Sequence, residues 1–354
     1  MTQPTSNSAN GPAAVKQRSF TGSLLTWLDS DKSVVVADET QIDRVDWVRV
    51  LPFVGMHLAC LSVIYVGVST AAVVAAAALY AIRMFAVTGF YHRYFSHRSF
   101  KTSRVGQFIF AVLGASAVQR GPIWWAAHHR HHHAHSDQRP DVHSPVQRGF
   151  LWSHMGWFLS RRHFHPDLSR VRDLLRFPEL RVLDRFDILV PVALAAGMLL
   201  LGKALAHWAP QLHTSGAQML VWGFFVSTVV CYHATYTINS LCHVFGRRRY
   251  DTDDDSRNNA WLALLTFGEG WHNNHHHYPV SARQGFYWWE VDLTYYGLKV
   301  LQMLGLIWDL KPVPEHIRAA HKGSRIADDC KADALLSTAE TMEEATLPTR
   351  AFNR

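Results

Sequence analysis

Histidine is concentrated in three short stretches of this sequence, and its spacing there suits metal chemistry. The stretches are HRYFSH at 92–97, HHRHHHAH at 128–135 and HNNHHH at 272–277. On a helix, residues three and four positions apart share one face. A histidine followed by two more at those positions can therefore aim three imidazoles at one point. The second and third stretches both contain this pattern.

The second stretch offers the pattern in two registers, one beginning at His128 and the other at His129. In the third stretch the triplet begins at His272. His92 and His97 are five positions apart, about 140° around an ideal helix. That pair therefore needs a helix end, or a geometry that brackets the site from two sides.

A further pair, Asn239 and His243, lies one helical turn apart between the second and third stretches. His92 and His97, the two triplets and His243 together make nine histidines. Imidazole binds zinc, copper, iron and nickel, and a closed zinc site uses only about four ligands. Two ions with open positions for water or oxygen fit nine histidines better. The near absence of carboxylates distinguishes this set from the glutamate-rich ligands of ferritin-like di-iron bundles.

Two long uncharged runs must position these histidines. Residues 50–82 and 204–246 contain no Asp, Glu, Lys or Arg over 33 and 43 positions. A transmembrane helix takes about 20 apolar residues, so the first run must turn back, most simply at residues 67–70. The sequence predicts four spans, near 50–67, 69–90, 187–208 and 217–240.

The charges of the loops predict the orientation of these spans. Residues 91–186 carry 15 Lys and Arg, whereas the turns at 67–71 and 209–216 carry none. Because cytoplasmic loops are enriched in Lys and Arg, we expect residues 91–186, both termini and all the histidine stretches on the cytoplasmic side, at the inner membrane if the protein is bacterial. The net charge of +7 reflects this bias, and we expect no nucleic-acid partner.

The predicted fold class is all-α: a polytopic membrane protein with four transmembrane helices and a cytoplasmic helical cap that holds a histidine-rich di-iron site. The expected organisation is a polar N-terminal segment (1–45), a membrane domain (46–325) and a disordered tail (326–354). The four cysteines form no CxxC pair, so neither an iron–sulfur nor a zinc-ribbon site is predicted.

The motifs HRYFSH, HRHHH and HNNHH, with NSLCH before the last, resemble those of the membrane-bound acyl-CoA desaturases of the stearoyl-CoA (delta-9) type. The likeness extends over about residues 50–300 and includes RGFLWSHMGW at 148–157. It implies four membrane helices and a di-iron centre bound by nine histidines and one water, held by Asn239. Carried over by motif, the ligands are His92, His97, His129, His132, His133, His243, His272, His275 and His276.

This ligand set uses the later register of the second stretch, which keeps HSDQRPDVH at 135–143 in step with the family. The Arg-Asp that the family carries ahead of the first histidine becomes Ala127-His128 here. His128, His131, His135 and His277 are then left as supporting or solvated residues. The resemblance also implies a polar trio at the bend of an acyl tunnel, formed by Gln119, Trp125 and Thr235, although Trp125 could equally be an interfacial anchor.

The implied activity is O₂-dependent insertion of a cis double bond, expected at delta-9, into a saturated acyl chain carried by CoA or another acyl carrier. Side chains alone cannot remove hydrogen from adjacent CH₂ groups, so two Fe²⁺ ions must supply the chemistry. Electrons must come from an external donor of the ferredoxin, rubredoxin or cytochrome b5 type with its reductase. Glu269, Asp137 and Asp141 are the nearest candidates for orienting the imidazoles.

Two alternatives stay open on the sequence. A membrane di-iron hydroxylase of fatty acids or alkanes would share the metal chemistry and differ only in the product. A histidine-rich metal transporter would place ligands inside the spans, where the sequence offers only His57, His207 and His233. We expect those three to be isolated from one another, which disfavours transport.

Overall fold

The computed structural model describes residues 25–32 and 44–321, and this part of the chain is mostly helical. The predicted tail (326–354) lies outside the described residues, as does most of the predicted N-terminal segment. The α-helices are α2 (Trp47–Cys60), α3 (Val63–Val66), α4 (Thr70–Phe85), α5 (Arg104–Ala115), α6 (Pro122–His135), α7 (Pro145–Arg148), α8 (Trp157–Leu159), α9 (Arg172–Leu175), α10 (Pro178–Arg185), α11 (Leu189–Trp208), α12 (Gly216–Gln218), α13 (Ser227–Ser240), α14 (Ala260–Leu265), α15 (His272–His277), α16 (Leu293–Met303) and α17 (Glu315–Ala319).

Short 3₁₀ and π segments and one two-stranded sheet complete the described chain. Strands β1 (Lys101–Thr102) and β2 (Ile307–Trp308) pair antiparallel, with Lys101 opposite Trp308. The remaining elements are η1 (Ser30–Lys32), η3 (Ala86–Ser96), η4 (Trp152–Gly156), η5 (Arg161–His163), η6 (Leu168–Val171), η7 (Pro210–Leu212), η8 (Met219–Val226) and η9 (Leu241–His243).

Three continuous helices in the described chain are long and apolar enough to cross a membrane. They are Thr70–Ser96, Leu189–Trp208 and Gly216–His243, and they correspond to three of the four predicted spans. The remaining span, expected near 50–67, is the shorter apolar helix Val50–Val66, which is interrupted between α2 and α3. The structure therefore supports a helical membrane protein with three spans by length.

The predicted reversal of the chain at residues 67–70 is present. Helix α3 ends at Val66, and the Ser69 hydroxyl caps α4 by accepting a hydrogen bond from the Ala72 amide. Gly67 has φ 68°, a left-handed conformation that glycine adopts without a steric penalty. The chain can thus leave α3 and enter α4 within a few residues.

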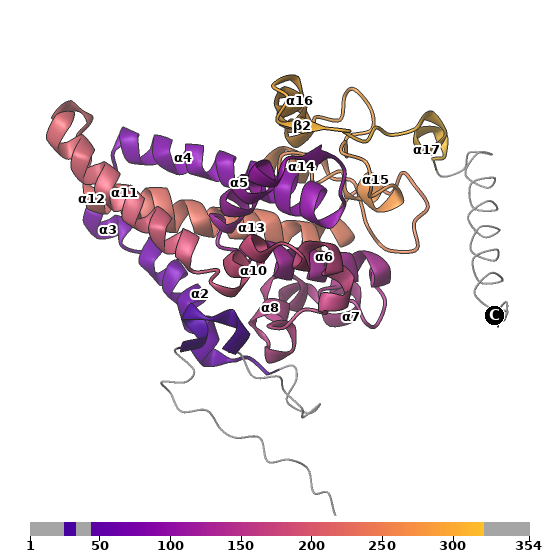
Figure 1. Cartoon of the computed structure of the whole chain (residues 1–354), viewed down its shortest axis with the longest axis horizontal. Helices are drawn as coiled ribbons and strands as arrows, with labels where there is room; N and C mark the ends of the chain where they lie inside the picture. Colours follow the sequence, from indigo (N-terminus) through magenta and orange to yellow (C-terminus); the bar gives the residue numbers. More distant parts are fainter. Residues whose placement is uncertain (1–24, 33–43, 322–354) are drawn as a thin grey trace, which may run out of the picture.

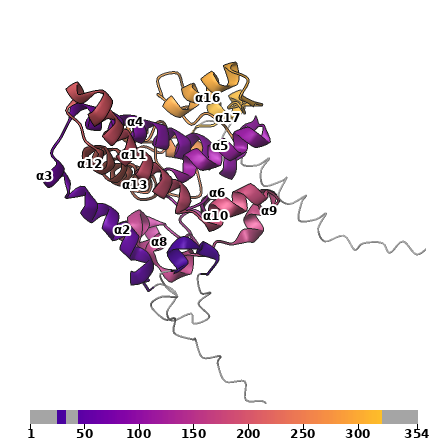
Figure 2. The ribbon, with the colours of Figure 1, turned by 60° about the vertical axis from the view of Figure 1, so that its left-hand side comes forward.

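The apolar helices form a bundle around α4 and the continuous η8–α13 helix. Figures 1 and 2 show α4, α11 and α13 side by side, with α2 on the flank. Ala72, Met198, Met219 and Phe224 form a buried cluster where α4, α11 and η8 meet. Arg83 of α4 is fully buried and donates hydrogen bonds to Thr228, Ser227 and the Gly223 carbonyl. These bonds fasten α4 to η8–α13 and satisfy a cation that would otherwise be costly inside a span.

Helix α4 continues directly into the π-helix η3, which carries the first histidine stretch. In a π-helix the backbone bonds join residues five apart, and the His97 amide donates to the His92 carbonyl. Two residues five positions apart therefore fall on the same side. The sequence required a helix end or a bracketing geometry for this pair, and His97 does follow the last residue of η3.

Helix α5 holds η3 in place by a close approach at Gly114. A Cβ atom at this position would lie 2.0 Å from the Tyr91 ring, so only glycine allows this contact. Tyr91 is fully buried and precedes His92. The packing of α5 therefore positions the start of the histidine stretch.

The elements outside the bundle gather at one end of it. In Figure 1 the apolar helices α11 and α12 extend to the left, whereas α6, α7, α15 and α16 lie toward the right. The ends of two candidate spans, at Ser96 and His243, enter this same region. The fold thus brings all three histidine stretches to one end of the bundle.

Candidate metal centre

The nine histidines picked out from the sequence fall into two adjoining groups. Within each group, one ring nitrogen per residue lies within 4.8 Å of the others. His132 and His133 are neighbours in the chain and belong to different groups, so the groups adjoin. The first group is His92, His97, His129, His133 and His275, and the second is His132, His243, His272 and His276.

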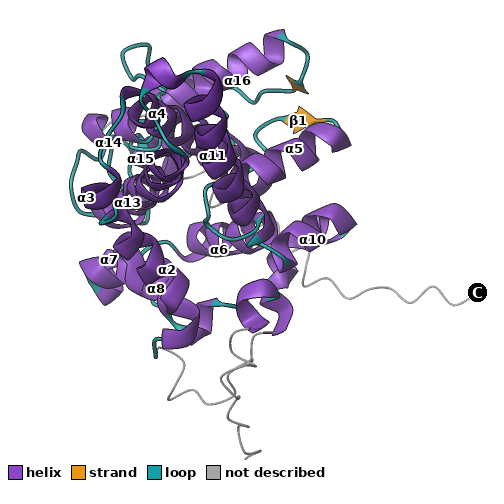
Figure 3. Ribbon diagram, turned by 90° about the vertical axis from the view of Figure 1, so that its left-hand side faces the viewer, coloured by secondary structure: helices purple, strands orange, loops and turns teal. Residues whose placement is uncertain are grey.

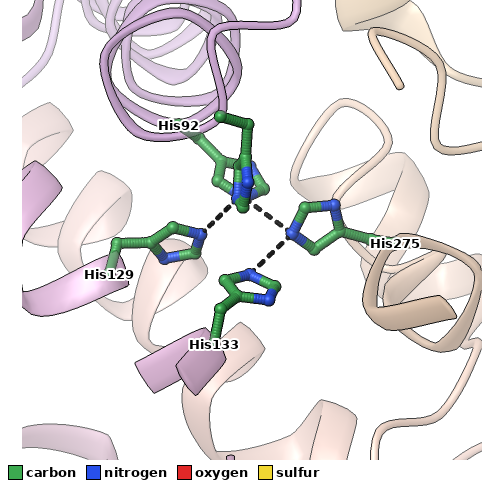
Figure 4. A group of neighbouring side chains, drawn as sticks. His92, His129, His133 and His275 are labelled. Carbon is green, nitrogen blue, oxygen red and sulfur yellow. Dashed lines mark hydrogen bonds between the residues drawn. The ribbon is translucent and has the colours of Figure 1, made fainter. Parts of the chain in front are cut away.

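The rings of the first group point their nitrogens at a common centre, as Figure 4 shows for the four residues that it labels. His92 Nε2 and His275 Nε2 are 3.0 Å apart, and His275 Nε2 and His133 Nε2 are 2.9 Å apart. His97 Nε2 lies 2.8 Å from His129 Nε2. These residues come from η3, α6 and α15 and from the residue after η3, so tertiary packing creates the group.

The second group is assembled from α6, η9 and α15. His243 Nε2 lies 3.0 Å from His272 Nε2. The ring of His276 packs 4.4 Å from that of His272, centroid to centroid. His276 Nε2 is buried and has no hydrogen-bond partner, which leaves its lone pair directed into the group.

The donor set fits metal ions better than it fits a network of hydrogen bonds. A metal with imidazole bonds of about 2.0–2.1 Å places neighbouring ligand nitrogens about 3 Å apart, which matches the observed separations. A neutral imidazole has only one N–H, and four of the Nδ1 atoms here face carboxylates. A buried unpaired acceptor such as His276 Nε2 is costly unless a ligand satisfies it.

The surroundings keep the imidazoles neutral, the form that binds metal. Removal from water and the neighbouring histidines hold the pKa values of His129, His133, His272 and His275 well below the ordinary value. Burial also acts to lower the pKa of His132, but the Asp141 carboxylate outweighs it and raises that pKa. Most of the centre is therefore ready to coordinate a cation at neutral pH.

Carboxylates orient four of the nine rings from behind. Glu269 lies 2.5 Å from His92 Nδ1, and Asp141 lies 3.0 Å from His132 Nδ1. Each of these Nδ1 atoms can donate its proton to the carboxylate, which fixes the ring so that Nε2 faces the centre. The other two contacts are Asp137 to His243 Nδ1 at 2.7 Å and Asp254 to His276 Nδ1 at 2.5 Å.

Two contributors were missed by the sequence analysis. Asp254 belongs to the acidic run DTDDDS at 251–256, which does not reveal which carboxylate faces inward. His143 is buried with its ring 4.2 Å from that of His132, and it forms a further potential metal-binding group with His132 and Asp141. His143 ends the stretch HSDQRPDVH, where it is not part of a helical histidine triplet, so its spacing did not mark it as a candidate.

The remaining histidines of the second and third stretches lie outside both groups. His128 Nε2 bonds to the His163 carbonyl, and His131 Nε2 bonds to the Pro140 carbonyl. His135 accepts from Arg170, and His277 bonds to the Ile317 carbonyl. The later register of the second stretch is therefore the one whose rings face the groups.

Asn239 lines a small cavity beside the histidines. The cavity measures about 40 Å³ and also contacts His92, His129, His132 and His272. A space of this size and polarity can hold an ordered water molecule. Its position agrees with the expectation that Asn239 holds a water molecule at the metals, which stays a prediction.

The expected substrate trio lines a larger and mostly apolar cavity of about 390 Å³. Gln119 Nε2 donates to Thr235 Oγ1 at 3.1 Å. Trp125 stacks on His129 with 5.0 Å between ring centroids. Because Trp125, His129, Thr235 and Asn239 line both cavities, the larger one leads to the histidine groups.

The expectation that His57, His207 and His233 are isolated is wrong for two of them. His57 Nε2 lies 3.1 Å from His233 Nε2, and His233 Nδ1 lies 3.0 Å from His154 Nε2. His154 continues to Ser240 Oγ at 3.0 Å. Helical periodicity cannot reveal this contact, because it joins α2 to α13 and η4. Both nitrogens of His233 face other imidazoles, so the three rings do not converge on one point.

The sequence is similar to those of known desaturases. The fatty acid desaturase family model matches residues 69–301. An sn-1 stearoyl-lipid 9-desaturase of Anabaena variabilis is 41% identical over 271 residues, 76% of this chain and 94% of that protein. An acyl-CoA 5-desaturase of Anemone leveillei is 36% identical over 312 residues, 85% of this chain and 91% of that protein.

A further relative is the sn-1 stearoyl-lipid 9-desaturase of Synechocystis sp., which is 41% identical over 218 residues, 61% of this chain and 64% of that protein. The relatives thus carry the names of both lipid-linked and CoA-linked desaturases. They agree in the reaction that their names describe, the desaturation of an acyl chain.

Proposed function

This chain belongs to the fatty acid desaturase family, and we propose that it inserts a cis double bond between C9 and C10 of a saturated acyl chain at a centre of two iron ions. The family makes it an oxidoreductase that introduces double bonds into fatty acyl chains. The gathering of nine histidines in groups of five and four carries the metal assignment. The C9 position rests on the names of two of the relatives.

In this proposal the five-histidine group holds one iron and the four-histidine group, with a water held by Asn239, holds the other. Bound iron, reduced by an external donor, would supply the O₂ chemistry that no side chain can. Two hydrogens leave adjacent CH₂ groups, and O₂ takes up these, two electrons and two protons to give two water molecules. The centre lies on the cytoplasmic side, where a ferredoxin, rubredoxin or cytochrome b5 type donor with its reductase can deliver the electrons.

The protein's own contribution is positioning. The hydrogen-bonded side chains of Gln119 and Thr235 and the Trp125 ring line the larger cavity near His129. An acyl chain threaded past them is held with one pair of CH₂ groups facing the histidines. Fixing the reacting atoms in this way lowers the entropic part of the barrier.

The test is fatty acid analysis of a desaturase-deficient host that expresses the chain. We expect a new monounsaturated acid with its double bond at C9, located by mass spectrometry of its dimethyl disulfide adduct. His275→Ala, expressed at the same level, should give none because His275 contacts both His92 and His133. A hydroxylated product without an alkene would replace the desaturase proposal with the hydroxylase alternative.

A further inference from the structure

The larger cavity reaches the surface between two apolar helices. Helix α2 contributes Pro52, Phe53 and Met56 to its lining, and α11 contributes Val192 and Ala195. Pro52 is exposed and Val192 is 57% exposed, so both stand at the rim. The cavity therefore opens where α2 and α11 face the surroundings.

Helices α2 and α11 flank this opening. Both pack against η8, and Figure 3 shows them at separate positions around the centre of the bundle. Phe224 of η8 lines the cavity between them. An entrance of this kind needs no movement of η8, because α2 and α11 are its two flanks.

The surface around this opening is suited to hydrocarbon. Leu51 and Val54 of α2 and Leu189 of α11 are exposed. Helix α11 is apolar enough to cross a membrane, and α2 forms most of the shorter apolar helix Val50–Val66. Large exposed apolar areas mark contacts with membranes or partners. The rim of the cavity is thus positioned to face lipid tails.

The side of the cavity nearest α10 is covered by residues 25–32. Thr26 and Trp27 line the cavity there. The Trp27 indole donates to the Val48 carbonyl at 2.9 Å, and Asp29 pairs with Arg185 at 2.7 Å. These contacts hold Thr26 and Trp27 at the cavity wall. Among the described residues that line the cavity, the exposed ones are Pro52 and Val192, which places the opening at the gap between α2 and α11.

The described lining of the cavity offers little charge to a headgroup of any kind. Arg120 is the one Lys or Arg among the described lining residues, and it pairs with Asp187 at 3.3 Å. Phosphate groups are bound in proteins by arginine and lysine. A phosphate group, whether of CoA or of a lipid, would therefore stay outside this lining, which accommodates the hydrocarbon tail; the carrier is assigned from the membrane-facing position of the opening.

We infer that the acyl chain enters sideways through the gap between α2 and α11 while it is esterified to a membrane glycerolipid. The headgroup stays at the membrane surface, and only the hydrocarbon tail slides past Phe53 toward Thr235 and His129. This inference rests on the proposed desaturase function and names the substrate class of that site.

The test compares desaturation of a lipid-linked and a CoA-linked acyl chain. It then fills the gap between α2 and α11 with larger side chains. The full-length, iron-loaded protein is placed in liposomes and assayed with ferredoxin, rubredoxin and cytochrome b5 in turn, each with its reductase and reduced nicotinamide cofactor. One substrate is phosphatidylcholine with deuterated stearate at sn-1, and the other is deuterated stearoyl-CoA. We expect the lipid to be desaturated at least tenfold faster, with the new double bond still on the intact lipid.

Val192→Trp should reduce turnover of the lipid at least tenfold by filling the rim, and Ala195→Trp should do the same from deeper in the gap. Leu200→Trp is the matched control: Leu200 is on the same helix, is 62% exposed and does not line the cavity, so its turnover should equal that of the unchanged protein. Iron content measured in parallel shows that the variants are folded.

The outcomes separate the two proposals. Faster desaturation of stearoyl-CoA than of the lipid, or full activity of both blocked variants, would overturn the sideways entrance and leave the desaturase function intact. Iron-loaded protein that desaturates neither substrate would overturn the proposed function itself.

Discussion

Each imidazole at this centre has two ring nitrogens, and for four of the nine a carboxylate fixes which one faces inward. Nδ1 of His92, His132, His243 and His276 is engaged by Glu269, Asp141, Asp137 and Asp254. The proton is thereby held on the outer side of each ring, and Nε2 is left with a free lone pair. At the residue scale, the site is a set of oriented lone pairs.

Adjacent histidines should therefore differ sharply in importance. His276→Ala should abolish activity and reduce bound iron, because this ring belongs to the four-histidine group. His277→Ala should have a mild effect, because the His277 ring stacks on Tyr250 at 4.1 Å and bonds to a backbone carbonyl. The measurements are the yield of unsaturated fatty acid and the iron content per chain of each variant. An inactive His277 variant with a dispensable His276 would show that the assignment in α15 is shifted by one residue.

Asp254→Asn should weaken iron binding by about 10–100-fold, the usual cost of losing a group that orients a ligand. The reason is the 2.5 Å contact of Asp254 with His276 Nδ1. Competition with a calibrated chelator measures the change. Asp253→Asn is the matched control, because Asp253 is exposed, and its iron affinity should not change. Equal affinities in the two variants would contradict the role given to Asp254.

The nine histidines could be predicted from the sequence, but some of their partners could not. The triplet in α15 follows from helical spacing, which is a local property. In α6 the spacing allows two registers, and the resemblance to the desaturases selected the later one. Asp254 and His143 reach the centre only because loops fold back onto α6 and α15, and spacing along the chain carries no record of such contacts. The same reason explains why the contact of His57 with His233 was missed.

At the scale of elements, the π-helix η3 turns a spacing of five into a shared face. In an α-helix His92 and His97 would diverge by about 140°. In the structure their ring centroids lie 4.8 Å apart. The sequence signalled that an α-helix would not suffice here. It did not signal the π-helix, which depends on the packing of η3 against α5 and α6.

Gly114→Ala should destabilise the protein by about 1–3 kcal/mol, the usual cost of overpacking. The added methyl group would collide with Tyr91, next to His92. Gly55→Ala is the control, since a Cβ at Gly55 meets nothing within 4 Å and alanine favours helix. Thermal unfolding in detergent and iron content are the measurements. If the two alanine variants unfold at the same temperature, the close approach of α5 to η3 is not a constraint.

At the scale of the whole molecule, an apolar bundle carries the metal centre at one end, where the ends of two candidate spans meet α6 and α15. Three of the four predicted spans, and the gathering of the histidines at one end of the bundle, could be read from the sequence. The interruption of the Val50–Val66 helix could not, because its residues are apolar on both sides of the break.

The iron-free protein should lose stability as pH falls from 7.5 to 5.5. Four histidines have folded-state pKa values well below the ordinary value, which is about 6.5 in the unfolded chain. Below that pH the unfolded chain binds more protons, so the free energy of unfolding decreases. His132, whose pKa is raised, acts in the opposite sense but is one group against four. An unfolding temperature that rises on acidification would contradict this.

The most direct test of the central claim is the iron content of purified, active protein, determined by mass spectrometry against the protein concentration from amino-acid analysis. Two groups of histidines predict two irons per chain, with desaturase activity proportional to iron as the protein is loaded. One iron per chain at full activity, or full activity with zinc in place of iron, would contradict the claim that these nine histidines hold a di-iron centre.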